Sequence, residues 1–351
     1  MIELEKGSLS NRDLPDGCKL CREGAKLVLF ATGLCNFKCF YCPLSAGKKN
    51  RDVIYADERP IFNDMDILEE AILIDSKGAG ITGGDPLNVI DRTVHYIKFL
   101  KEYFGDRYHI HLYTATASTD RVKLLSDAGL DEIRFHVPVR LWGRLKGSKY
   151  EEVLKFSKNL MKTGIEIPVL PDQKENLIKL IDDAQGIGID FINLNELEFS
   201  ETNYESLRLH HYRTKSYISS GVFGSQSLAR KIILDNDFSV TVHYCSAAFK
   251  DAVQLRNRIK RRARNVAKKY EVITKDGTLL FGIIECNDLE SAMENLESMD
   301  IPNDLFEYDE EKHRIKIAPW ILEKIDMPGC RKYEVEEYPT YDRLEVERTP
   351  L

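Results

Sequence analysis

The chain has 351 residues, of which 43% are apolar and 30% charged, and its formal net charge at pH 7 is −7. This length is enough to bury a sizeable core and predicts one large domain with a smaller one, while the acidic balance argues against a general nucleic-acid binder. No run of about 20 apolar residues occurs, and the N-terminus has neither the basic nor the apolar part of a signal peptide, so we expect a cytoplasmic protein.

Short apolar runs alternate with amphipathic helical patterns between about residue 26 and residue 200. The first strand is expected over 26–33 ("KLVLFATG") and the first helix over 63–78. The following strands are expected over 78–84, 108–116, 132–138, 165–171 and 191–199, and the helices over 89–105, 118–129, 149–163 and about 174–186. Six strands that alternate with helices through short loops predict an α/β fold with a parallel sheet, a partial (β/α)6 TIM-like barrel.

The alternation stops near residue 200, and an α+β pattern follows. The segment 200–226 has no clean period and is expected to be loop with one short helix. A strand is then expected over 238–244, two strands around a Lys-Asp-Gly turn within 270–284 and paired strand segments within 305–317, with a basic helix over 255–270 and another helix over 288–299. The predicted organisation is an N-terminal CxxC segment over 1–25, the barrel over 26–235 and an appended α+β domain over 236–351.

Three cysteines, Cys35, Cys39 and Cys42, follow the first strand in the stretch "LCNFKCFYCPLSAG". They therefore lie at the carboxyl edge of the predicted sheet, where α/β folds bind their ligands. The spacing CxxxCxxC lets three thiolates hold one [4Fe–4S] cluster and leaves its fourth iron open to a small molecule. A zinc site completed by Cys18 and Cys21 is the alternative interpretation.

This motif, with Tyr41 before its last cysteine, resembles that of the radical S-adenosylmethionine (AdoMet) enzymes. The resemblance covers about residues 26–200 and extends to the activating enzymes of the pyruvate formate-lyase type. It implies that the open iron binds AdoMet, with Tyr41 beside the adenine. It also implies that an electron from a donor such as ferredoxin or flavodoxin cleaves AdoMet to a 5′-deoxyadenosyl radical, which abstracts hydrogen from the substrate.

A second motif, "TGGDP", follows the second strand and resembles the family's Gly-Gly-Glu sequence, with aspartate in place of glutamate. Two adjacent glycines permit a close approach of the backbone that any Cβ would obstruct. The resemblance makes Thr82, Gly83, Gly84 and Asp85 candidates for binding AdoMet, with backbone groups holding its ammonium.

Strand alternation predicts which polar side chains face the cavity. On the strand over 132–138, Arg134 and His136 share one face, and on the strand over 191–199 Asn193 and Asn195 do so. By the resemblance, Thr114, His136 and Asn195 are candidates for contact with AdoMet. The alternative is that such residues satisfy buried polar neighbours, which is also how we interpret His109 and His111.

A second metal site is predicted around the CxxC pair Cys18 and Cys21, since this spacing lets two thiolates hold one ion. Cys245 would be a third ligand, and His243, Cys330 or Cys286 a fourth. Zinc and an auxiliary iron–sulfur cluster both suit such ligands, and a pair of unligated thiols is the alternative. Disulfides are not expected, because they are rare in cytosolic proteins.

The helix over 255–270 is strongly basic in an otherwise acidic chain, which marks a surface for anions. One interpretation is contact with RNA phosphates, and the other is pairing with the acidic segments 307–313 and 334–347. The candidate RNA-binding residues are Arg256, Arg258, Lys260, Arg261, Arg262 and Arg264.

Three functions are compatible with these features. The first is a radical enzyme that modifies RNA such as tRNA, and the second is a radical enzyme that acts on a protein or a metabolite, as activating enzymes do. The third is a non-catalytic metal-containing module that binds nucleic acid. The motifs specify neither the substrate nor whether AdoMet is consumed or regenerated.

Overall fold

The computed structural model describes residues 1–351, which form two compact units. The first unit comprises Met1–Ile72 and Ser76–Leu255, and the second comprises Leu73–Asp75 and Arg256–Leu351. The boundary therefore follows residue 255 and not residue 235, and the N-terminal 25 residues belong to the first unit. No helix is long and apolar enough to cross a membrane.

The first unit is built on a sheet of seven parallel strands with short antiparallel strands at both edges. In spatial order the parallel strands are β13 (Thr241–Cys245), β10 (Phe191–Glu196), β9 (Lys162–Val169), β8 (Glu132–Phe135), β7 (His109–Thr114), β6 (Gly78–Thr82) and β3 (Lys26–Phe30). The edge strands are β1 (Ile2–Glu3) and β2 (Leu9–Ser10) beside β13, and β4 (Tyr55–Ala56) and β5 (Arg59–Pro60) beside β3. The predicted partial barrel is confirmed, with β13 as a further parallel strand.

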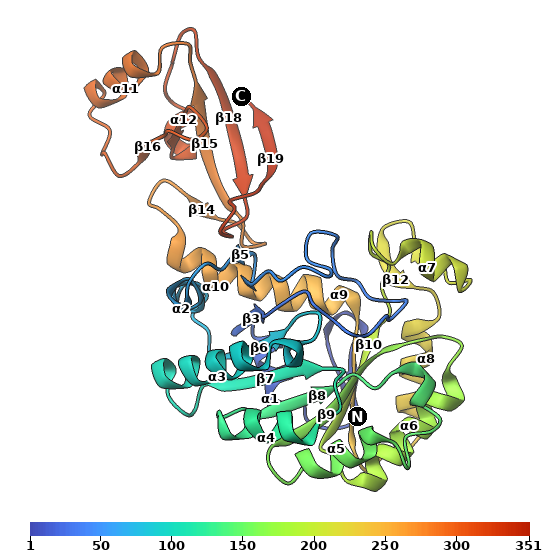
Figure 1. The fold of residues 1–351 in the computed structure, drawn as a ribbon. Helices are drawn as coiled ribbons and strands as arrows, with labels where there is room; N and C mark the ends of the chain where they lie inside the picture. The colour runs from blue at the N-terminus through green and yellow to red at the C-terminus, as the bar shows by residue number, and fades with distance from the viewer. The chain divides into compact units, whose positions relative to one another are not determined.

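Helices cover the outer side of this sheet, as Figure 1 shows for α3 to α6. The helices of the alternating part are α2 (Asp64–Leu73), α3 (Ile90–Phe104), α4 (Thr119–Asp127), α5 (Lys149–Ser157), α6 (Lys174–Ile187) and α8 (Ser225–Asp235). Their first turns are set by local sequence: Ser118 and Ser148 accept backbone N–H groups at the start of α4 and α5. The fully buried Ile97 and Leu180 show the faces that α3 and α6 turn inward.

The helix α1 (Asp16–Arg22) packs on the side of the sheet that carries the inward polar side chains. It contacts β3, β6 and β7. A Cβ built on Gly17 would lie 2.5 Å from both Arg134 Nη2 and His111 Nδ1, so a larger residue here would force these buried side chains to move. Because Cys18 follows Gly17, its side chain is carried into the polar interior, where it is 6% exposed.

The segment after β10 is more regular than the sequence predicted. It contains α7 (Tyr204–Leu209) and a hairpin of β11 (Thr214–Ser216) and β12 (Ser219–Val222). After β13 the chain continues through α9 (Ala247–Phe249) and the π-helical turn η4 (Lys250–Leu255). Three short 3-10 turns complete the unit: η1 (Glu5–Gly7), η2 (Pro86–Val89) and η3 (Val139–Leu141).

The second unit is an α+β structure, as predicted. It begins with the basic helix α10 (Arg256–Val266), and its antiparallel sheet has the order β16, β17, β15, β18, β19, with β14 paired to β15. The strands are β14 (Val272–Ile273), β15 (Leu279–Glu285), β16 (Phe306–Asp309), β17 (Arg314–Ile317), β18 (Arg331–Glu337) and β19 (Glu345–Pro350). The helices α11 (Leu289–Ser298) and α12 (Pro319–Leu322) join Ile284 and Phe281 in two buried apolar clusters.

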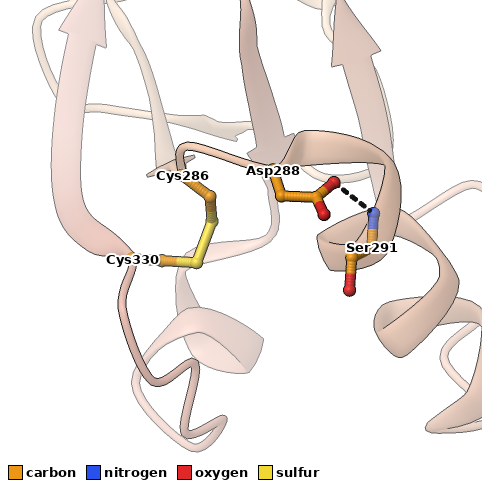
Figure 2. Close-up of a disulfide and its surroundings, with 4 residues drawn as sticks. All are labelled: Cys286, Asp288, Ser291 and Cys330. Carbon is orange, nitrogen blue, oxygen red and sulfur yellow. Dashed lines mark hydrogen bonds between the residues drawn. A yellow bond between two sulfur atoms is a disulfide. The ribbon is translucent and has the colours of Figure 1, made fainter.

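A disulfide joins Cys286 to Cys330 in this second unit (Figure 2). The pairing follows from the sheet, because Glu285 and Arg331 are partners in the antiparallel β15–β18 ladder. The residue after Glu285 and the residue before Arg331, which are the two cysteines, therefore face each other. The two Cα atoms are 4.4 Å apart, within the range that a disulfide spans. The expectation that the chain has no disulfide is therefore wrong, and neither cysteine is free to complete a metal site.

Candidate active site

Cys35, Cys39 and Cys42 lie in the loop that follows β3, at the carboxyl edge of the parallel sheet. All three are free, partly buried thiols, and burial raises the pKa of Cys35 and of Cys39. Three sulfur donors on one short loop fit a [4Fe–4S] cluster with one open iron. In this structure no three His, Cys, Asp or Glu side chains are gathered closely enough to hold a metal ion.

The glycine motif at the end of β6 is packed against the start of this loop. Gly84 N donates to Thr32 O at 2.7 Å, and Asp85 N donates to Leu34 O at 2.8 Å. A Cβ on Gly83 would collide with the Thr32 carbonyl, and one on Gly84 with that of Leu34. The close approach expected of the two glycines is therefore present, and what approaches is the backbone that leads into the cysteines.

Asp85 is fully buried and holds neighbouring strand ends together. Its carboxylate accepts hydrogen bonds from Leu87 N at 3.1 Å, Thr114 Oγ1 at 2.7 Å and Thr116 Oγ1 at 2.8 Å. The structure thus brings together two predicted residues, Asp85 and Thr114. Since its oxygens are used within the protein, Asp85 supports the motif, and direct contact with AdoMet stays a prediction for both residues and for Thr82.

Tyr41 and His136 meet beside the cysteine loop. Tyr41 Oη lies 2.9 Å from His136 Nε2, and Cys39 Sγ lies 3.9 Å from the same nitrogen. The other ring nitrogen, Nδ1, is 3.1 Å from the carbonyl oxygen of Glu166 and therefore carries the proton. Burial lowers the pKa of His136, so the imidazole is neutral and Nε2 accepts from the Tyr41 hydroxyl.

Glu166 on β9 joins the inward side chains of three further strand positions. Its carboxylate receives Asn193 Nδ2 at 2.9 Å, Asn195 Nδ2 at 2.9 Å and Arg134 Nη1 at 2.8 Å. Burial by itself raises the pKa of Glu166, but Arg134 and the two amides outweigh it, and the net shift is downward. The carboxylate is therefore charged.

The predicted inward faces of β8 and β10 are confirmed by these contacts, whereas Glu166 was missed. The sequence feature that could have identified Glu166 is an acidic residue between two isoleucines, Ile165 and Ile167, in the predicted strand over 165–171. His111 also faces this side, with Nε2 2.8 Å from Lys26 Nζ, while His109 lies 3.6 Å from Glu132. Both histidines have protein partners, in keeping with a structural role.

Comparison with known proteins supports the assignment of the cysteine loop as a cluster-binding loop. The Radical SAM superfamily profile matches residues 29–184, and a domain of unknown function, DUF8061, matches residues 277–351. A protein of Methanocaldococcus jannaschii, named provisionally as a glycyl-radical enzyme activating enzyme, is 44% identical over 368 residues, which cover 99% of this chain and 96% of that protein.

Two solved structures also resemble part of the chain. SuiB of Streptococcus suis, bound to S-adenosylmethionine, matches with a TM-score of 0.42 and 15% identity over 63% of this chain and 50% of its own. Methylornithine synthase matches with a TM-score of 0.43 and 12% identity over 63% of this chain and 70% of its own. With its cysteine loop, its parallel sheet and its full-length relative, the chain belongs to the radical SAM superfamily, an enzyme family that uses a [4Fe–4S] cluster and AdoMet.

Proposed function

We propose that this enzyme abstracts a hydrogen atom from the backbone of a partner protein, as a glycyl-radical enzyme activating enzyme does. The observation that carries the proposal is the 44% identity to the M. jannaschii protein, which runs through both units and not through the cysteine motif alone. When bound, the cluster supplies the electron that cleaves AdoMet to methionine and a 5′-deoxyadenosyl radical.

The chain's own residues would position the reactants. Cys35, Cys39 and Cys42 would hold the cluster. Tyr41 and His136, joined at 2.9 Å beside Cys39, would orient the adenine. Asn195, held at 2.9 Å by Glu166, would offer its remaining amide groups to the ribose or carboxylate. A fixed orientation is what directs a short-lived radical to one hydrogen atom.

The test is an anaerobic reaction of the cluster-loaded enzyme with AdoMet, a low-potential reductant and a glycyl-radical enzyme deuterated at the glycine α-carbon. We expect 5′-deoxyadenosine that contains deuterium, and with the unlabelled partner enzyme we expect the EPR doublet that the remaining α-hydrogen gives a glycyl radical. Cys35→Ser should abolish both products. If 5′-deoxyadenosine forms but carries no deuterium from any glycyl partner, the superfamily chemistry stands and the activating function is wrong.

RNA is the weaker candidate substrate, because much of the charge on α10 is used inside the second unit. Arg256 Nη2 lies 2.7 Å from Asp276 Oδ1, and Arg261 pairs with Asp75. Beyond the helix, Lys268 pairs with Glu307 in one of the acidic segments. This pairing supports the alternative interpretation of the basic helix. Affinity for tRNA that falls steeply with salt would favour RNA over a protein substrate.

A further inference from the structure

Four potential metal ligands that the AdoMet chemistry does not use lie on α1 and β13, on the inward side of the first unit, although they are not gathered around one point in this structure. Cys18 and Cys21 are three residues apart on α1 and therefore share a helix face. His243 and Cys245 are two residues apart on β13 and share a strand face. In the parallel pairing of β13 with β10, these two are opposite Asn193 and Asn195, which point inward.

The side chain of Asn193 connects the two elements. Its Nδ2 donates to Cys18 Sγ at 3.3 Å and to Glu166 Oε2 at 2.9 Å. Because a carboxylate oxygen can only accept, these contacts fix the orientation of the amide group, with its nitrogen toward Glu166. Its Oδ1 lies 3.3 Å from His243 Nδ1 and accepts the proton of that nitrogen. One amide group therefore contacts both Cys18 and His243.

His243 is left with an unused lone pair. Since Nδ1 carries the proton, Nε2 is an acceptor, and it has no hydrogen-bond partner although the residue is only 1% exposed. A buried imidazole held through Nδ1–H by an oxygen, with Nε2 free, is the usual state of a metal-binding histidine.

Nitrogen donors lie beside two of the buried thiols. Arg134 Nη2 lies 3.5 Å from Cys18 Sγ, and Gln254 Nε2 lies 3.5 Å from Cys245 Sγ. Cations and N–H donors around buried sulfur offset the cost of burying its charge.

We propose that Cys18, Cys21, Cys245 and His243 form a second metal site that takes a single zinc-type ion in a tetrahedral shell. A Cys3His set supplied in pairs by two elements is a common arrangement for structural zinc. The disulfide removes Cys286 and Cys330 from the alternatives and leaves His243 as the fourth ligand. The ion would connect α1 to β13, the outermost of the parallel strands, and so fix the position of the N-terminal helix against the sheet.

The test is the metal content of the full-length protein, measured by mass spectrometry after dialysis and again after anaerobic cluster reconstitution. We expect one zinc per chain in addition to cluster iron. Cys21→Ser and His243→Ala should each lower retained zinc at least tenfold without reducing iron, whereas Cys35→Ser should reduce iron without reducing zinc. The matched control is His109→Ala, since His109 also has a buried nitrogen without a partner but lies beside Glu132.

Cobalt binding keeps the test decisive if the variants fold poorly. Co²⁺ added to zinc-depleted wild-type protein should give the intense visible bands of a tetrahedral thiolate site and lose them when zinc is added. Absence of both zinc and the cobalt bands, or zinc unaffected by the two variants, would overturn the proposal. Extra iron and sulfide that disappear in Cys21→Ser would also overturn it, because they would show an iron–sulfur cluster and not a single ion.

Discussion

At the scale of single residues, the candidate site depends on side chains and glycines that position neighbouring groups. Gly83 and Gly84 bring the end of β6 against the cysteine loop, and Glu166 gathers Arg134 and two asparagine amides on the inward face. The sequence predicted the glycines, because two adjacent residues without a Cβ after a strand are typical of a close backbone approach. It did not predict Glu166, because one acid in an apolar strand does not show which neighbours it meets.

Substituting Gly84 by alanine should displace the cysteine loop. The new Cβ would collide with the carbonyl oxygens of Leu34 and Gly33, which are backbone atoms with little freedom to move. We expect the Gly84→Ala enzyme to form 5′-deoxyadenosine at least about tenfold more slowly and to retain less iron, since misplacement by about 1 Å is costly in catalysis. Gly47→Ala is the matched control, because nothing lies within 4 Å of its Cβ position. Equal losses in both variants would contradict the argument.

Replacing Glu166 by glutamine should destabilise the first unit. The change leaves Arg134 buried with one charged partner fewer, and breaking a buried pair in this way costs about 3 kcal/mol. The loss would be measured by urea denaturation at pH 7, with exposed Glu152→Gln as the control expected to leave the midpoint unchanged.

The difference in unfolding free energy between the wild type and Glu166→Gln should depend on pH in a predictable way. Because the pKa of Glu166 is lowered from its ordinary 4.5, its contribution is complete above pH 4.5 and is lost as the pH falls through the lowered value. The difference in unfolding free energy between wild type and Glu166→Gln should therefore be constant from pH 7 to 5 and shrink below 4.5. A difference that grows on acidification would refute the charged state of Glu166.

At the scale of elements, the predictable parts were those with strong local patterns. The six strands β3, β6, β7, β8, β9 and β10 and the helices between them were expected near their observed positions, although the helices predicted over 63–78 and 149–163 end earlier, at Leu73 and Ser157, and the short strands β4 and β5 were not predicted. The strand β13 was predicted but assigned to the wrong domain, because the irregular segment before it hides its parallel pairing with β10. The disulfide was missed for a similar reason: its cysteines are separated by 44 residues and become neighbours only through the register of β15 and β18.

Removing this disulfide should destabilise the second unit. Closing a loop between cysteines 44 residues apart restricts the unfolded chain by an amount that corresponds to about 4 kcal/mol. The Cys286→Ser/Cys330→Ser protein should unfold at a lower urea concentration. Because the chain has 2 tryptophans, the unfolding of the second unit can be measured by the fluorescence of Trp320 in a Trp142→Phe background. Adding a reductant should lower the midpoint of the parent protein but not of the double variant. An unchanged midpoint in the double variant would mean that the bond constrains little.

At the scale of the whole molecule, the chain combines a catalytic fold with a second unit that has its own core. The first unit holds the cysteine loop, the glycine motif and the inward polar face, whereas Phe281, Ile284 and Ile317 belong to apolar clusters within the second. The sequence indicated the chemistry through one motif and indicated the second unit only as an α+β pattern. Neither the cysteine motif nor the second unit identifies the substrate. The motif indicates only the cofactor, and the second unit matches a domain of unknown function.

Separate cores predict that AdoMet stabilises one unit selectively. Trp142 is buried in the first unit and Trp320 belongs to α12 of the second, so single-tryptophan variants report each unit by itself. A ligand at 100 times its Kd stabilises the unit that binds it by about 2.7 kcal/mol. With the cluster loaded under anaerobic conditions, AdoMet should therefore raise the urea midpoint reported by Trp142 and leave that reported by Trp320 unchanged. If both midpoints rise together, the two units unfold as one cooperative structure, and the expectation of separate unfolding is wrong.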